Sequence, residues 1–190
     1  MSEARSSADD RLLKSFKYLN RFMLALFRLG LGRWVNGWPS VGGRIMVLTH
    51  VGRKTGIRRR TPLNYVIVDG DVYCLAGFGS GSDWYRNILA NPEIEIWLPD
   101  GWWAGSATDI SDSDSRIDLL RKVLIASGFA AWLAGIRPRT DSDQTLAALT
   151  EKYRLLRIRR SHGLTGRGGP GDLAWIWPLA TLVLLLILLF

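Results

Sequence analysis

A cationic glycine turn is the segment of this chain best suited to chemistry. The motif T-H-V-G-R-K-T-G spans residues 49–56 and carries Arg53, Lys54 and Thr55 between Gly52 and Gly56. Glycine lets the backbone adopt positive φ and expose its N–H groups. Arginine adds a planar fork of donors and lysine a mobile point charge. The turn indicates either a clamp for one anion or a solvated basic hairpin tip.

Apparent strands flank this turn. Apolar residues recur over residues 44–49 and alternate with polar ones over residues 63–68, which is typical of strands. Thr61 and Pro62 start the second strand, where the missing N–H of proline does least harm. A Walker loop and a dinucleotide fingerprint both need a helix after their glycines. Neither motif fits this strand, turn, strand unit.

A second motif, W-Y-R-N, follows a glycine-rich loop over residues 77–82. Asp83 is a favourable N-cap for a short helix over residues 84–90, which Asn91-Pro92 would end. Further strands are predicted over residues 72–76, 93–98, 102–107 and 155–158, and further helices over residues 114–127 and 145–153. These elements position both motifs in a single α+β domain.

Taken together, these segments resemble the deazaflavin-dependent nitroreductase and quinone reductase family. The matching pieces are L-T-x-x-G-R-K-T-G at 48–56, T-P-L at 61–63, W-Y-x-N at 84–87 and A-N-P at 90–92, in the family's order. The resemblance covers roughly residues 35–160. It implies a small split β-barrel with flanking helices that binds coenzyme F420 and transfers a hydride from its reduced form to a lipophilic quinone or nitro compound.

The resemblance also implies which residues hold the cofactor. Arg53 and Lys54 correspond to clamps for its anionic tail, and Trp84 with its neighbours to a packing face for the deazaflavin ring. The full implied set is Arg53, Lys54, Thr55, Gly56, Thr61, Pro62, Phe78, Gly79, Ser80, Trp84, Tyr85 and Asn87. Many family members have a lysine in the loop before W-Y. This chain has none there, and Arg58, Arg59 or Arg60 could supply the charge. Flavin mononucleotide is a less expected cofactor.

Two aromatic residues are candidates for the acceptor side. Phe129 and Trp132 lie where the family places aromatics over the cofactor, so they resemble walls of a pocket for a flat acceptor. They could equally be core aromatics that seal the barrel. Both interpretations stay open from the sequence.

Other chemistry has few residues to use. The chain has one cysteine, Cys74, and two histidines, His50 and His162, so neither a zinc cluster nor a Cys-His dyad is expected. Cys74 fits a small buried apolar position, and His50 either touches a ligand or is incidental. No catalytic acid or base is nominated. Hydride transfer tolerates this, because the cofactor carries the reactive atom.

The C-terminal end predicts a membrane anchor. Residues 173–190 are almost wholly apolar and would form about 27 Å of helix, close to one hydrocarbon thickness. Trp175 and Trp177 stand at its start, as interfacial aromatics do, and arginines precede it. We therefore expect a single-pass transmembrane helix with the folded domain on the cytoplasmic face of the membrane. A buried apolar tail is the alternative.

The N-terminal end predicts a basic amphipathic helix over residues 11–34. Its apolar stripe is Leu12, Phe16, Leu19, Met23, Leu26 and Phe27. This helix could lie on anionic lipid or pack on the barrel. The remaining boundaries are a disordered start at 1–10, a barrel domain at 35–162 and a linker at 163–172.

Composition limits the partners. The net charge of +8 and pI of about 10.1 favour an anionic partner, and a single cysteine excludes an internal disulfide. The alternative to an enzyme is a split-barrel module that binds or sequesters an anionic cofactor (F420, FMN or haem) or lipid. Nucleic acid is disfavoured, because an anchor restricts access and no sheet face shows paired aromatics. A homodimer is left open.

Overall fold

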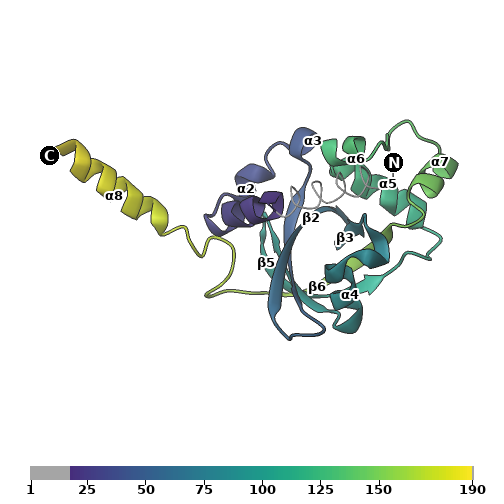
Figure 1. The fold of residues 1–190 in the computed structure, drawn as a ribbon, viewed down its shortest axis with the longest axis horizontal. Coiled ribbons are helices and arrows are strands. Elements are labelled where there is room, and N and C mark those ends of the chain that lie inside the picture. The colour runs from purple at the N-terminus through teal and green to yellow at the C-terminus, as the bar shows by residue number, and fades with distance from the viewer. Residues whose placement is uncertain (1–17, 190) are drawn as a thin grey trace, which may run out of the picture.

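The computed structural model describes residues 18–189, apart from the side chains of Ser40 and Val41. Its centre is a closed barrel with the strand order β1-β2-β3-β6-β5-β4 (Figure 1). The strands are β1 (Ile45–Val51), β2 (Arg58–Val68), β3 (Asp71–Ala76), β4 (Glu93–Leu98), β5 (Gly101–Asp109) and β6 (Arg154–Gly163). Every strand predicted from the sequence is present. The predicted disorder of residues 1–10 lies outside the described residues.

Strand alternation gives the barrel its two surfaces. Met46 and Leu48 of β1 are fully buried in the barrel interior with Ile96 and Leu156. Val47, which lies between them in sequence, faces outward and packs against Phe27 and Trp97. Successive strand residues point to opposite faces, so one run of apolar residues serves both an inner and an outer core.

The strand β2 begins earlier than the sequence indicated. We expected it to start at Thr61-Pro62, whereas its first residue is Arg58. Residues 58–64 pair with β1, and residues 65–68 pair with β3. Pro62 therefore lies where β2 has no partner on its second edge, and proline is tolerated at such an edge. Three consecutive arginines, residues 58–60, therefore belong to the strand.

Helices surround the barrel on several sides. They are α2 (Gly32–Val35), α3 (Pro39–Gly42), α4 (Asp83–Ala90), α5 (Arg116–Ala126), α6 (Phe129–Leu133), α7 (Asp143–Leu149) and α8 (Ile176–Leu189). Figure 1 shows α5, α6 and α7 gathered on one side of the barrel. Tyr85 and Ile88 of α4 insert into the barrel core, so α4 is fixed to the barrel by burial.

The N-terminal helix packs on the barrel through only part of its predicted stripe. The described part spans residues 18–28, and Leu12 and Phe16 lie outside it. Phe27 is buried against the outer face of β1 and β4, while Leu19 is 46% exposed. The barrel-packing alternative is thus confirmed for Phe27. Tyr18 and Phe22 are exposed as well.

The end of the predicted linker is bonded to the end of the N-terminal helix. Gly171 N donates to Phe27 O at 2.9 Å, and Leu173 N donates to Arg28 O at 2.8 Å. The Arg28 guanidinium forms an ion pair with Asp172, with Nε 2.9 Å from Oδ1. Trp177 Nε1 donates to Leu29 O at 2.9 Å. These bonds tie the start of α8 to the end of the N-terminal helix.

The predicted transmembrane anchor requires a correction. We expected an apolar helix over residues 173–190, but α8 has 14 residues, about 21 Å of helix against about 30 Å of hydrocarbon. The first residues of the apolar run, Leu173 and Ala174, form turns that dock on the N-terminal helix. Within residues 18–189, no helix combines the length and the apolar character that crossing a membrane requires. Figure 1 shows α8 extending away from the barrel.

Removing volume from the barrel interior should destabilise the protein. Ile96 is fully buried, so Ile96→Ala should lower the free energy of unfolding by about 3 kcal/mol through lost burial and a residual cavity. Urea unfolding followed by tryptophan fluorescence measures this. Ile57→Ala is the matched control, because Ile57 is 60% exposed and its truncation should change stability by less than about 0.5 kcal/mol. Equal losses in both variants would contradict the assigned core.

Candidate functional site

The glycine turn between β1 and β2 is closed by its own backbone. Gly52 N donates to Ile57 O at 2.9 Å, and Gly56 N donates to Gly52 O at 2.8 Å. Gly56 has φ of +65°, which favours glycine. A Cβ on Gly52 would lie 2.8 Å from Thr55 Oγ1 and 3.3 Å from Ile57 O, so the turn packs closely around this position. Both glycines of the motif therefore have a local structural reason.

Helix α4 holds Arg53 in place. The Arg53 guanidinium donates to Asp83 Oδ1 at 3.2 Å and to Asn87 Oδ1 at 2.9 Å. The Arg53 backbone N–H donates to the same Asn87 oxygen at 3.1 Å. We expected Asp83 to be the N-cap, but Ser82 occupies that position and Asp83 is the first helical residue. The two motifs are thus joined directly, and Arg53 has a structural role in joining them.

The other side of the Asn87 amide reaches His50. Arg53 donates twice to Asn87 Oδ1, so the amide nitrogen Nδ2 faces His50 Nδ1 at 3.2 Å and donates to it. His50 Nδ1 must then be an acceptor, which puts the ring proton on Nε2. His50 Nε2 lies 3.2 Å from Thr61 Oγ1 and donates to that oxygen. The tautomer of His50 therefore follows from the bonds of its neighbours.

His50 is held in its neutral form. Its side chain is 2% exposed, and burial is the main cause that lowers its pKa to about 4, with the nearby Arg59 charge adding to the effect. A neutral ring leaves Nδ1 able to accept from Asn87. His50 is therefore part of the site framework, a role that the sequence analysis left undecided.

Two cations near the turn are left for a ligand. Lys54 and Arg59 are both exposed, and neither forms an ion pair within the described part of the chain. Arg59 lies opposite His50 in the strand register, with its Nε 3.3 Å from where a Cβ on Gly52 would lie. Thr55 is exposed beside Lys54. Arg59 is thus the member of the arginine run that belongs to this site.

The glycine-rich loop before α4 contributes a second cationic surface. Phe78, Gly79 and Ser80 line a cavity of about 410 Å³, and Glu151, Lys152 and Arg154 complete its lining. Gly79 has φ of +55°, and a Cβ there would lie 2.1 Å from Lys152 O, so the loop packs backbone to backbone on residue 152. Lys152 and Arg154 therefore place positive charge beside a loop that has none. Sequence reasoning missed both residues, because they lie about 70 positions away.

The two aromatic residues of W-Y-R-N take different positions. Trp84 is half-buried against the barrel core and forms an edge contact with Tyr85, with ring centroids 6.5 Å apart. Tyr85 is buried, and its hydroxyl donates to Asp109 Oδ2. Burial and this carboxylate raise the pKa of Tyr85 to about 12. Trp84 therefore offers some surface to a ligand, while Tyr85 anchors α4 inside the barrel.

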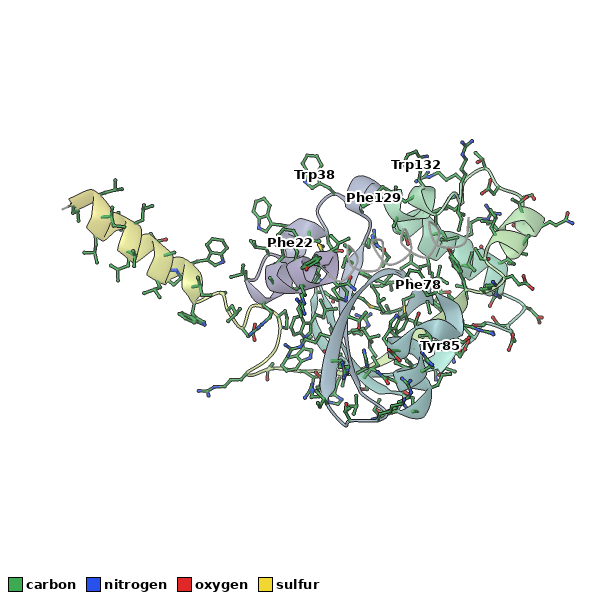
Figure 2. All side chains as sticks on the ribbon, in the orientation of Figure 1. Phe22, Trp38, Phe78, Tyr85, Phe129 and Trp132 are labelled. Atoms are coloured by element: carbon green, nitrogen blue, oxygen red, sulfur yellow. The ribbon has the colours of Figure 1, made fainter. Side chains whose placement is uncertain are left out.

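Phe129 and Trp132 lie in another part of the molecule. They belong to α6 and are 48% and 67% exposed, so the interpretation as core aromatics that seal the barrel is wrong. Figure 2 shows them on the side of Trp38, at a distance from Tyr85. The described residues thus bring the turn, Thr61 and Asn87 together, and leave Phe129 and Trp132 apart from them.

Comparison with known families identifies the family of this chain. The model of the F420H(2)-dependent quinone reductase family matches residues 20–132, which is more than half of the chain. The chain belongs to this family. Its cofactor is therefore coenzyme F420, and the protein is an F420-dependent oxidoreductase, as the motifs indicated.

Solved structures match parts of this chain at low sequence identity. An F420-H2 dependent reductase, FDR-A, is 18% identical with a TM-score of 0.45, over 61% of this chain and 94% of its own. The haem storage protein HutZ from Vibrio cholerae is 14% identical with a TM-score of 0.42, over 68% of this chain and 89% of its own. The conserved hypothetical protein Rv2991 from Mycobacterium tuberculosis is 17% identical with a TM-score of 0.46, over 73% of this chain and 91% of its own.

The residues of this family member fit an anionic cofactor better than a metal. The described residues contain no group of three His, Cys, Asp or Glu side chains that could hold a metal ion. Cys74 is buried in the barrel, and burial raises the pKa of its thiol to about 12, as expected for a small apolar position. By contrast, Lys54 and Arg59 form a donor set suited to a phosphate or carboxylate tail.

The buried neutral histidine should make stability depend on pH. Above pH 6.5 His50 is uncharged in both folded and unfolded states, so it adds no pH dependence. As the pH falls from about 6.5 to 4, the unfolded state takes up a proton that the folded state resists. Wild type should lose up to about 3 kcal/mol of unfolding free energy over this window from His50 alone.

Urea unfolding at pH 7, 5.5 and 4 measures this effect against His50→Gln. Glutamine does not titrate, so the stability of the variant should fall less steeply between pH 7 and pH 4. His162→Gln is the control, because His162 is exposed. If His50→Gln and wild type show the same slope, His50 is not held neutral by the fold.

Proposed function

We propose that this oxidoreductase passes a hydride from reduced F420 to a lipophilic quinone at the cytoplasmic face of the membrane. The observation that carries the cofactor side of the proposal is the exposed pair Lys54 and Arg59 beside a turn that α4 holds rigid. Nitro compounds are a second class of acceptor for the same chemistry, since they also accept a hydride.

Each residue has a separate task in this proposal. Lys54 and Arg59 bind the anionic tail, and the backbone of the turn is preorganised by Arg53, Asn87 and His50. Lys152 and Arg154 extend the positive surface along the loop of residues 77–82. Trp84 packs against the ring. A tail held at several fixed points limits the positions of the ring, which favours transfer through proximity.

The chemistry requires little more from the protein. When bound, the reduced deazaflavin supplies a hydride, which carries the two electrons that convert a quinone to its quinol together with one proton from solvent. The described residues near Trp84 must exclude water and hold the acceptor against the ring. Tyr85 does not supply the proton, because its pKa is raised and its hydroxyl is committed to Asp109.

Exposed apolar side chains support contact with a membrane surface. Phe22, Trp34, Trp38, Phe129 and Trp132 are all at least 48% exposed. Figure 2 shows Trp38, Phe129 and Trp132 along one side of the molecule. Aromatic side chains of this kind favour the membrane interface. The apolar side chains of α8 from Trp177 onward are also exposed, so this helix can insert its length into one leaflet. Such contact would bring a quinone dissolved in lipid to the protein.

Charge removal at the turn tests the cofactor side. Lys54→Gln should weaken F420 binding about tenfold without changing stability, because Lys54 forms no ion pair among the described residues. Arg53→Gln should lower both affinity and stability, because Arg53 also joins the turn to α4. Fluorescence titration with oxidised F420 at two salt concentrations gives affinity, and urea unfolding gives stability.

The matched control is Lys122→Gln, an exposed lysine on α5 that forms an ion pair with Asp118. It should leave F420 affinity unchanged. If Lys54→Gln binds F420 as tightly as wild type, the turn is not the clamp. Oxidation of reduced F420 by menadione and by a nitroaromatic compound, measured in parallel, identifies the preferred acceptor. Turnover of the nitro compound alone would overturn the quinone assignment.

A further inference from the structure

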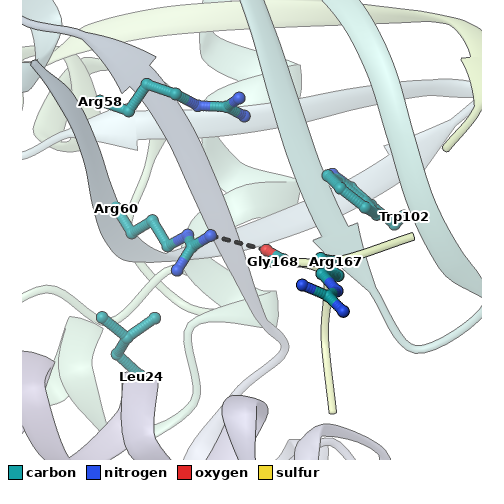
Figure 3. A pocket seen from close by; sticks show the side chains of 6 residues that line it. All are labelled: Leu24, Arg58, Arg60, Trp102, Arg167 and Gly168. Atoms are coloured by element: carbon teal, nitrogen blue, oxygen red, sulfur yellow. Dashed lines mark hydrogen bonds between the residues drawn. The ribbon is translucent and has the colours of Figure 1, made fainter. Parts of the chain in front are cut away.

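A second cationic cavity lies on the outer face of the barrel. Its volume is about 440 Å³, and it is lined by Leu24, Arg58, Arg60, Trp102, Arg167 and Gly168. These residues come from the N-terminal helix, β2, β5 and the segment after β6. Figure 3 shows the three arginines and Trp102 around a common space.

Strand alternation separates this cavity from the cofactor site. Arg59 and Thr61 pair with His50 and Leu48 and therefore lie on the inner face of β2. Arg58 and Arg60 point to the outer face. The run of three arginines thus supplies one charge to the turn and two to the cavity. The cationic turn and the outer cavity are therefore on opposite faces of β2.

The cavity walls are fixed by packing. Arg60 donates to Gly168 O at 2.6 Å, and its guanidinium lies over the Trp97 ring at 4.6 Å. Gly169 is buried, and a Cβ there would lie 2.6 Å from Trp102 Cε3, so the backbone lies flat on that ring. This close approach places Arg167 at the cavity. The segment that the sequence analysis treated as a linker therefore forms part of a wall.

The charge in the cavity is incompletely balanced. The lining contains three guanidinium groups and no carboxylate. Glu95 behind it already accepts from Arg58 and from Trp102 Nε1, and Asp172 is paired with Arg28. Arg167 forms no ion pair within residues 18–189. Burial is the main cause that lowers the pKa of Arg60; Asp172 and Glu95 oppose this effect, and Arg28 and Arg58 add to it, so the charged form of Arg60 would gain from a bound anion.

We propose that this cavity binds a phosphate group, with Arg58, Arg60 and Arg167 as donors and Leu24 and Trp102 packing against the group that carries it. Arginine forks match phosphate oxygens, and the apolar side of the cavity fits a ligand that is partly apolar. The phosphate can be that of an anionic phospholipid or of a small soluble phosphate ester. This site is separate from the cofactor site and does not rest on the proposed function.

The test uses the full chain and two probes. Binding of sn-glycerol 3-phosphate is measured by calorimetry, and binding to phosphatidylglycerol vesicles is compared with binding to phosphatidylcholine vesicles by sedimentation. Arg167→Gln should weaken phosphate binding about tenfold, because it removes a charged donor that has no other ion-pair partner. Arg167→Lys keeps the charge but loses the planar fork of donors. Its phosphate affinity should lie between those of Arg167→Gln and wild type.

Arg139→Gln is the matched control. It removes the same charge at an exposed position in the loop between α6 and α7, so phosphate binding should match wild type. A preference for phosphatidylglycerol that is lost only in Arg167→Gln would identify a lipid. Binding of sn-glycerol 3-phosphate without that preference would identify a soluble ester. Both results support the site.

Three results would overturn the proposal. The first is no binding of either probe, and the second is equal weakening in Arg167→Gln and Arg139→Gln, which would indicate net charge alone. The third is an F420 affinity that falls in Arg167→Gln as much as in Lys54→Gln, which would make the cavity part of the cofactor site. F420 titrations of both variants therefore distinguish failure of this site from failure of the proposed function.

Discussion

The site depends on the hydrogen bonds of the Asn87 side chain. Its oxygen accepts from the backbone and the guanidinium of Arg53, and its nitrogen donates to His50. One amide thereby joins helix α4, the glycine turn and the inner face of the barrel. Because each partner fixes the orientation of the next, the amide orientation, the histidine tautomer and the turn geometry are set together. A ligand meets a preorganised surface.

Barrel alternation is the second constraint. The same β2 strand presents Arg59 and Thr61 to the inner face and Arg58 and Arg60 to the outer face. The three consecutive arginines are thus divided between the glycine turn and the outer cavity. The segment after β6 completes the outer site only because Gly169 allows its backbone to lie on Trp102.

The sequence was sufficient for the parts of the fold with local causes. Apolar runs and turn signals predicted each strand, and Asn91-Pro92 ended α4 where expected, at Ala90. The sequence did not predict the start of β2, because three arginines do not show the apolar signal of a strand. Pairing with β1 stabilises them in the strand. The sequence failed at α8 too. An apolar run predicts a helix but not its first residue, and hydrogen bonds to Phe27 and Arg28 hold residues 171–173 outside the helix.

By itself the sequence determined the family, the cofactor class and the residues of the cationic turn, because these reside in short motifs whose spacing is local. Only the tertiary structure decided how the motifs meet. It paired Arg53 with Asp83 and Asn87, made His50 a neutral buried link, placed Lys152 and Arg154 at the loop without charge, and removed Phe129 and Trp132 from the core. Each of these features depends on contacts between residues more than 25 positions apart or on burial. Local sequence determines neither long-range contacts nor burial.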